Sequence, residues 1–171
     1  MRWLPLLVIV GLTGIVAMRL VHHQRSVRSL ASQLLILSYF AGLGIILFTP
    51  ISFDGSAVYV MPAGYGQVNL TRLSLMNVGF VENIILTVPL GLLMKRAFPN
   101  VSLITIGIIG LMIGSSIEIT QYYMSQYWLI NRSSDINDVL ANGTGVSLGG
   151  SVMAVVQRTF MQIPLKSRSK A

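Results

Sequence analysis

Five acidic residues are the side chains of this sequence best suited to acid–base chemistry or to binding a cation. They are Asp54, Glu82, Glu118, Asp135 and Asp138. All but Asp54 fall in or beside strongly hydrophobic stretches, where an ionisable group is costly and usually faces the protein interior. A polar cluster inside a hydrophobic protein is therefore the first candidate for a functional site.

The sequence excludes several common kinds of chemistry. It has no cysteine, which rules out disulfides, thiolate metal sites and cysteine nucleophiles. Serine-hydrolase, zinc-protease, phosphate-loop and dinucleotide motifs are absent. His22 and His23 lie among arginines without a carboxylate beside them, so we expect no metal and no cofactor. The basic residues form short clusters without interleaved aromatics, so we also expect no nucleic-acid binding.

The composition indicates a membrane protein. Of the 171 residues, 53% are hydrophobic and 10% are charged, whereas soluble domains are about a quarter charged. Five stretches approach the length that crosses a bilayer. They are residues 3–18, 30–49, 78–94, 103–124 and 139–156. We predict an all-α polytopic bundle of about five transmembrane helices, forming a single membrane domain over residues 1–171.

The first stretch, residues 3–18, has a second interpretation as a secretory signal peptide. Such a peptide carries its positive charges before the apolar run and a small-residue cleavage site after it. Here Arg19, Arg25 and Arg28 follow the run, and no such site is present. We expect a helix that is retained.

The distribution of lysine and arginine predicts the orientation in the membrane. With the N-terminus outside, the inner segments carry nine of these residues and the outer segments three. The positive-inside rule therefore places the N-terminus outside and a basic tail, residues 158–171, in the cytoplasm. The longest connection, residues 50–77, then lies outside. It is either a small hairpin or a loop on the membrane surface, and the sequence does not decide between them.

In this orientation, polar residues from three parts of the chain gather at the outer membrane boundary. They are Glu82, Asn83, Glu118, Gln121, Arg132, Asp135, Asp138 and Asn142. We predict that these eight residues bind a ligand, with Arg132 as the counter-charge to the carboxylates. Glu118, Asp135 and Asp138 are also the candidates for catalytic residues.

Two glycine stripes support this arrangement. At about 100° per residue, Gly110 and Gly114 share a helix face with Glu118, and Gly145 and Gly149 share one with Asn142. Small residues let membrane helices approach closely. We predict that helices 103–124 and 139–156 pack through these faces, which would bring their polar ends together. Glycine-rich faces are also candidates for an oligomer contact.

The same polar residues have a purely structural interpretation. Asp135 or Asp138 would cap the last helix, and Asn142 would form a hydrogen bond between helices. Glu118 and Arg132 would form a buried pair that fixes the packing. The sequence leaves both interpretations open.

Three segments that contain these polar residues resemble motifs of the VanZ-like family. The first runs from Glu82 to Gly91 and is similar to N-x-x-x-F-x-P-x-G, with Thr87 where an aromatic residue is common. The second, from Glu118 to Gln121, is similar to E-x-x-Q. The third, from Arg132 to Gly145, is similar to R-x-x-D-I-x-D-V-x-x-N-x-x-G. The resemblance covers about residues 40–156 and leaves the helix over 3–18 outside this core.

The resemblance implies a multi-pass protein of the bacterial inner (plasma) membrane. The family is named after a protein associated with low-level teicoplanin resistance, and its biochemical mechanism is not settled. We expect a cell-envelope protein that binds membrane lipids or lipid-linked cell-wall intermediates at the polar cluster, with a contribution to glycopeptide resistance. The alternatives are a membrane enzyme that acts on such a lipid and a small transporter.

Overall fold

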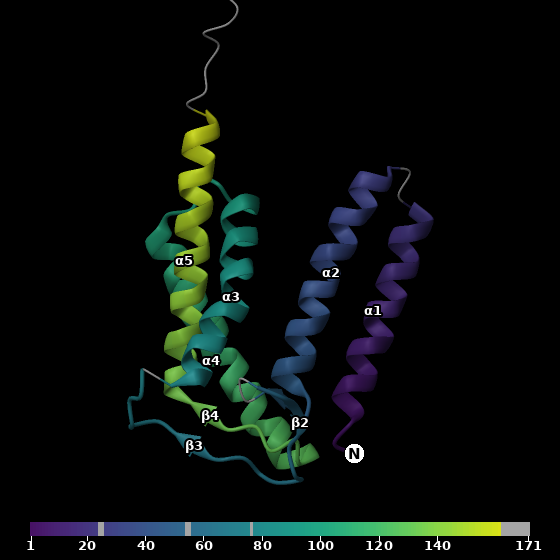
Figure 1. The fold of residues 1–171 in the computed structure, drawn as a ribbon, viewed down its shortest axis with the longest axis vertical. Helices are drawn as coiled ribbons and strands as arrows, with labels where there is room; N and C mark the ends of the chain where they lie inside the picture. Colours follow the sequence, from purple (N-terminus) through teal and green to yellow (C-terminus); the bar gives the residue numbers. More distant parts are fainter. Residues whose placement is uncertain (24–25, 54–55, 76, 162–171) are drawn as a thin grey trace, which may run out of the picture. The chain divides into compact units, whose positions relative to one another are not determined.

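The computed structural model describes residues 1–23, 26–53, 56–75 and 77–161, and within these ranges the chain forms five α-helices and four short β-strands (Figure 1). The helices are α1 (Leu4–His23), α2 (Val27–Phe48), α3 (Val78–Ala97), α4 (Leu103–Trp128) and α5 (Ile136–Met161). Each is long and apolar enough to cross a membrane. The predicted all-α polytopic fold is confirmed. Asp54 and most of the predicted basic tail lie outside the described residues.

Most helices extend beyond the apolar stretches that predicted them. α1 continues past Met18 to His23, and α5 begins at Ile136 rather than at residue 139. The difference arises because backbone hydrogen bonds, not hydropathy, determine where a helix ends. As a consequence, Asp138 lies in the first turn of α5. There its negative charge interacts favourably with the positive end of the helix dipole.

The chain folds as two compact units that alternate along the sequence. The first consists of Met1–Leu70 and Ile117–Asp135, and the second of Thr71–Ser116 and Ile136–Ala171. α4 is therefore shared between them. Its first half belongs to the second unit and its second half to the first.

The first unit contains a helical hairpin followed by short strands. α1 packs against α2, and a Cβ at Gly44 would lie 3.4 Å from the Ile9 side chain. After α2, strands β1 (Ile51–Phe53) and β2 (Val58–Val60) form an antiparallel pair. β3 (Val68–Asn69) pairs in parallel with β4 (Ser134–Asp135). Of the two interpretations of the connection 50–77, the structure thus supports the one with a small hairpin.

In the second unit, α5 packs against both α3 and the first half of α4. A Cβ at Gly110 would lie 2.8 Å from that of Val146, and one at Gly114 would lie 3.1 Å from that of Asn142. The predicted contact through the glycine stripe of α4 is confirmed, because any side chain at these two positions would hold the helices apart.

The glycines of α5 correct the other half of this prediction. Gly145 and Gly149 face α3 rather than α4: a Cβ there would overlap the Thr87 hydroxyl and the Ile84 carbonyl, or the Val88 carbonyl. The physical reason is that α5 has neighbours on two sides. Helical periodicity shows which residues share a face, but it does not show which neighbouring helix that face meets.

Buried residues are often polar in this protein, while its helices expose apolar residues. Thr49, Thr87, Ser125, Asn137 and Asn142 are each at most 2% exposed. α1, by contrast, exposes leucine, isoleucine and valine side chains along its length. This distribution fits a membrane protein, in which apolar side chains face the lipid and polar groups find partners inside the protein.

Candidate polar site

The second half of α4 carries three buried polar side chains, Glu118, Gln121 and Ser125. Their spacing of three and four residues places them along one face of the helix. The Glu118 carboxylate accepts a hydrogen bond from the Asp135 backbone N–H at 2.8 Å, and the Glu118 carbonyl accepts one from the Ser134 hydroxyl at 2.9 Å. Glu118 therefore holds β4 against α4.

Gln121 and Arg132 contact the C-terminal end of α2. The Gln121 amide donates to the Leu47 carbonyl at 2.9 Å. The Arg132 Nε donates to the Thr49 carbonyl at 3.2 Å. Its Nη2 donates to two further carbonyls, those of Ile46 and Ile51. The last carbonyls of a helix lack partners within it and carry the negative end of its dipole, so an arginine and an amide stabilise them.

Arg132 is itself held by Ser125. The Ser125 hydroxyl accepts from the Arg132 N–H and donates to its carbonyl, both at 2.9 Å. The loop reaches this position through left-handed residues, Leu129 and Asn131, with φ of 56° and 62°. The Asn131 side chain accepts from the Gly66 N–H at 3.1 Å. Sequence reasoning missed the roles of Ser125 and Asn131, although Ser125 lies on the same helix stripe as Glu118.

Asp135 joins the long connection to the end of α4. Its carboxylate accepts from the Asn69 side-chain amide at 2.9 Å, alongside the parallel pairing of β3 with β4. Sequence reasoning did not identify Asn69 as a partner of Asp135. Asp135 contributes to fold stability in the first unit.

In the second unit, Asn142 is buried with unsatisfied hydrogen-bonding groups. The residue is 1% exposed, and neither its Oδ1 nor its Nδ2 has a hydrogen-bond partner. Its backbone carbonyl accepts from the Thr87 hydroxyl at 3.2 Å, and its Cβ lies beside Gly114 of α4. The side chain therefore projects from α5 where α3 and α4 both pack against it.

Asn137, five residues earlier on the same helix, is equally buried, but both polar atoms of its side chain have hydrogen-bond partners. It is 2% exposed, yet its Oδ1 accepts from the Ser74 N–H at 2.8 Å and its Nδ2 donates to the Arg72 carbonyl at 2.9 Å. Asn137 thus fastens the segment before α3 to the start of α5. Sequence reasoning did not identify it as a site residue.

Glu82 and Asn83 lie in the first turns of α3. The Glu82 Oε1 is buried without a hydrogen-bond partner. The Asn83 carbonyl accepts from the Thr87 hydroxyl at 2.7 Å. Glu82 lies about 120–180° around the helix from the residues that contact α5, at about 100° per residue. It therefore points away from α5.

α3 and α5 run parallel, so their residues can be compared by depth. The contacts that fix the register join Ile84 with Gly145, Val88 with Gly149 and Lys95 with Gln157. The partners are 61 or 62 positions apart in each case. Glu82 is accordingly level with residue 143, and its unpartnered oxygen lies at nearly the depth of Asn142.

The eight predicted site residues divide equally between the two units. Glu118, Gln121, Arg132 and Asp135 belong to the first, and contacts within that unit link Glu118 directly to Asp135. Glu82, Asn83, Asp138 and Asn142 belong to the second. Across the described ranges, no group of three or more His, Asp or Glu side chains is placed to hold a metal ion. The expected pairing of Arg132 with a carboxylate stays a prediction.

These features define a class of protein: a polytopic helical membrane protein with polar side chains buried in and beside its spans. Within this class, the chain belongs to the VanZ/LLP1 family, whose model matches residues 6–157. The resemblance inferred from the three motifs is confirmed. The match includes most of α1, and the division into a core over 40–156 and an added N-terminal helix stays a prediction. No curated protein and no solved structure matches the chain.

Proposed function

We propose that this protein resides in the bacterial plasma membrane and binds the polar head of a membrane lipid or lipid-linked cell-wall intermediate. The ligand would bind at the outer ends of α3 and α5. Loss of this binding would alter the response of the cell envelope to glycopeptides such as teicoplanin. The observation that carries the proposal is the buried side chain of Asn142, whose two polar atoms have no partner.

An unsatisfied buried amide is energetically unfavourable. Each orphaned donor or acceptor costs about 1–3 kcal/mol, and the cost is not recovered by packing. An apolar residue would pack between three helices without this cost. A ligand that donates to Oδ1 and accepts from Nδ2 would remove the penalty, which accounts for an asparagine here.

The depth of Asn142 suits a ligand near the head-group region. Asn142 lies six positions after Ile136, the first residue of α5, which is a rise of about 9 Å at 1.5 Å per residue. Glu82 offers a second acceptor at nearly this depth, on the face of α3 that points away from α5. Hydroxyl, amide and ammonium groups, which are common in lipid heads and their saccharide or peptide extensions, supply donors for Asn142 Oδ1 and Glu82 Oε1, and hydroxyl or amide oxygens can accept from Asn142 Nδ2.

The test compares Asn142→Leu with Asn137→Leu. Leucine has the same number of side-chain heavy atoms as asparagine, and the two positions are equally buried on one helix. Asn142→Leu should be present at normal levels, melt no lower than wild type in detergent, and fail to restore the wild-type response to glycopeptides in a deletion strain. Lipids that co-purify with the wild-type protein, identified by mass spectrometry, should be depleted from this variant.

Asn137→Leu should instead lose folded protein, because it removes two hydrogen bonds and leaves the Ser74 N–H without this partner. Full complementation by Asn142→Leu would overturn the proposal. So would a loss of folded protein equal to that of Asn137→Leu, since Asn142 would then have a structural role.

A further inference from the structure

The hairpin of β1 and β2 has one wholly apolar face. Ile51 lies opposite Val60 and Phe53 lies opposite Val58, so these four side chains share one face of the two-stranded sheet. Phe53, Val58 and Val60 are 48%, 71% and 53% exposed. A hairpin in a water-soluble protein turns such a face toward a hydrophobic core. Among the described residues, Phe53, Val58 and Val60 have no such cover, and Ile51 is half-buried.

A polar side chain on the opposite face of the hairpin contacts the rest of the first unit. Ser52 and Tyr59 are paired on this opposite face. The Ser52 hydroxyl accepts from the Arg132 guanidinium at 3.5 Å, and the same guanidinium donates to the Ile51 carbonyl. The apolar face therefore points away from Arg132.

The hairpin is fixed at the end of two membrane spans. Ile51 follows the last residue of α2 by three positions, which limits their separation to about 11 Å. At the same open end of the hairpin, the Met61 N–H donates to the Pro50 carbonyl at 2.8 Å. The Met61 carbonyl in turn accepts from the Arg2 guanidinium, just before α1.

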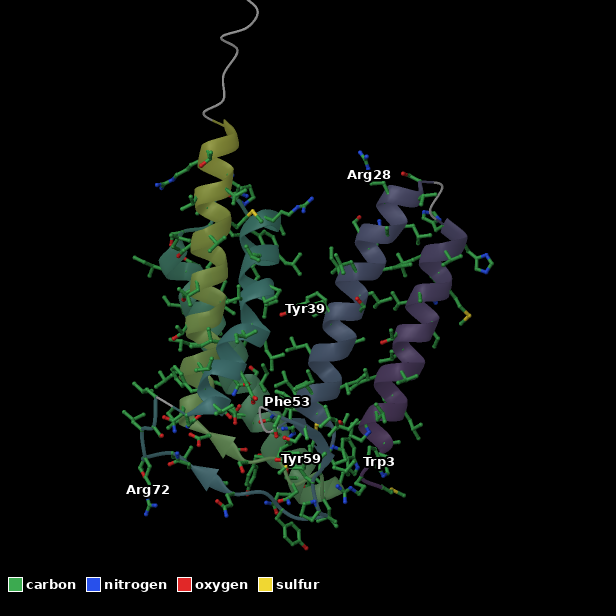
Figure 2. The ribbon with its side chains drawn as sticks, viewed as in Figure 1. Trp3, Arg28, Tyr39, Phe53, Tyr59 and Arg72 are labelled. Carbon is green, nitrogen blue, oxygen red and sulfur yellow. The ribbon has the colours of Figure 1, made fainter. Side chains whose placement is uncertain are left out.

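The surrounding residues are those of a membrane–water boundary. Figure 2 shows Trp3, Phe53 and Tyr59 at the same end of the helical hairpin, with Arg28 at its opposite end. Tryptophan and tyrosine concentrate at this boundary in membrane proteins. The sequence also has no charged residue between Asp54 and Arg72, so the segment lacks the charges that normally accompany a water-exposed surface.

We infer that the face formed by Ile51, Phe53, Val58 and Val60 is immersed in the lipid bilayer, at the level where acyl chains meet head groups. Lipid is the occupant because this face continues the lipid-exposed surface of α1 and α2 without an intervening charge. In the predicted orientation this is the outer leaflet. The hairpin is thus a shallow membrane anchor at the end of α2, and this inference does not depend on ligand binding at Asn142.

Site-directed spin labelling tests this directly, because the chain has no native cysteine. Val58→Cys and Val60→Cys would each be labelled in the full-length protein, in nanodiscs of phosphatidylethanolamine and phosphatidylglycerol. Ser133→Cys, at an exposed position of the loop before β4, is the matched control. Labels at 58 and 60 should be more accessible to oxygen, which partitions into lipid, than to a water-soluble nickel chelate, and the label at 133 should show the reverse.

Two outcomes would overturn the inference. If labels at 58 and 60 are as accessible to the nickel chelate as the label at 133, the face is in water. If instead they show spin–spin broadening that disappears on dilution with unlabelled protein, a second copy covers the face. Unchanged melting temperature and a single elution peak would show that each labelled variant is folded, so that either result can be interpreted.

Discussion

At the scale of single residues, polar side chains of the first unit mostly bind backbone groups. Gln121 and Arg132 donate to carbonyls around the end of α2, and the Glu118 carboxylate accepts from the start of β4. In a membrane, water cannot satisfy such groups, so side chains must do so. Several motif residues of the family thus have a structural role in addition to any part in binding.

Replacing Arg132 tests this structural role. Arg132→Lys should lower the melting temperature in detergent by several degrees, because one ammonium group cannot reproduce the several donors of the guanidinium. Loss of a single charge-assisted hydrogen bond costs about 1.5–3 kcal/mol. Arg28→Lys, at an exposed position in the first turn of α2, is the control and should melt like wild type. Equal melting temperatures for all three proteins would show that the contacts with α2 do not stabilise the fold.

Glu118 allows charge and hydrogen bonding to be separated. Glu118→Gln keeps an oxygen that can accept from the Asp135 N–H, so it should be folded and present at wild-type levels. Glu118→Leu removes that acceptor and should be less stable by about 1–3 kcal/mol. Melting curves and immunoblots of membranes measure both effects. If Glu118→Gln is as unstable as Glu118→Leu, the charge itself stabilises the fold.

At the scale of the elements, α5 is the helix around which the second unit is packed. Gly145 and Gly149 let α3 approach closely, while the glycines of α4 make room for Val146 and Asn142 on another face of α5. Glycines with open space beside them are found in α1, at Gly11 and Gly14. These positions offer an uncovered helix surface through which two copies of the protein could pack. The glycine-mediated oligomer itself stays a prediction.

A pair of alanine substitutions tests the packing of α3 on α5. At Gly145, a Cβ would overlap the Thr87 hydroxyl and the Ile84 carbonyl, so Gly145→Ala should force the helices apart and reduce the yield of folded protein severalfold. Gly14→Ala adds the same group where nothing lies within 4 Å and should leave the yield unchanged. Fluorescence-detected size-exclusion chromatography measures both. A normal yield for Gly145→Ala would mean that α3 and α5 do not pack as described.

The sequence was sufficient to predict the five spans and the polar residues near their ends. Hydropathy and helical periodicity are local properties of the sequence, and each span was long enough for both patterns to be recognised. The partners of those residues were not predictable in the same way. The contacts of Arg132 with α2 join positions more than 80 residues apart, and those of Asn137 with the segment before α3 join positions more than 60 apart. Nothing local in the sequence encodes such pairings.

At the scale of the whole molecule, basic residues lie near the C-terminal ends of α1, α3 and α5. In the first unit, Arg28 is at one end of the helical hairpin and Trp3 and Tyr59 at the other (Figure 2). In the second unit, α3 and α5 run parallel, and both have basic residues in their last turns. Each unit by itself therefore has the asymmetry that the positive-inside rule uses.

This asymmetry predicts which loops face the cytoplasm, and single cysteines can test it because the chain has none of its own. Ser133→Cys should react with a membrane-impermeant maleimide in intact cells. Ser26→Cys, in the basic connection between α1 and α2, should react only after permeabilisation. Thr87→Cys, fully buried in α3, should stay unlabelled in both conditions and serves as the control for accessibility. Labelling of Ser26→Cys but not Ser133→Cys in intact cells would invert the orientation. The face of Val58 and Val60 would then contact the inner leaflet, and the polar groups of Glu82 and Asn142 would lie on the cytoplasmic side, where a ligand exposed outside the cell could not reach them.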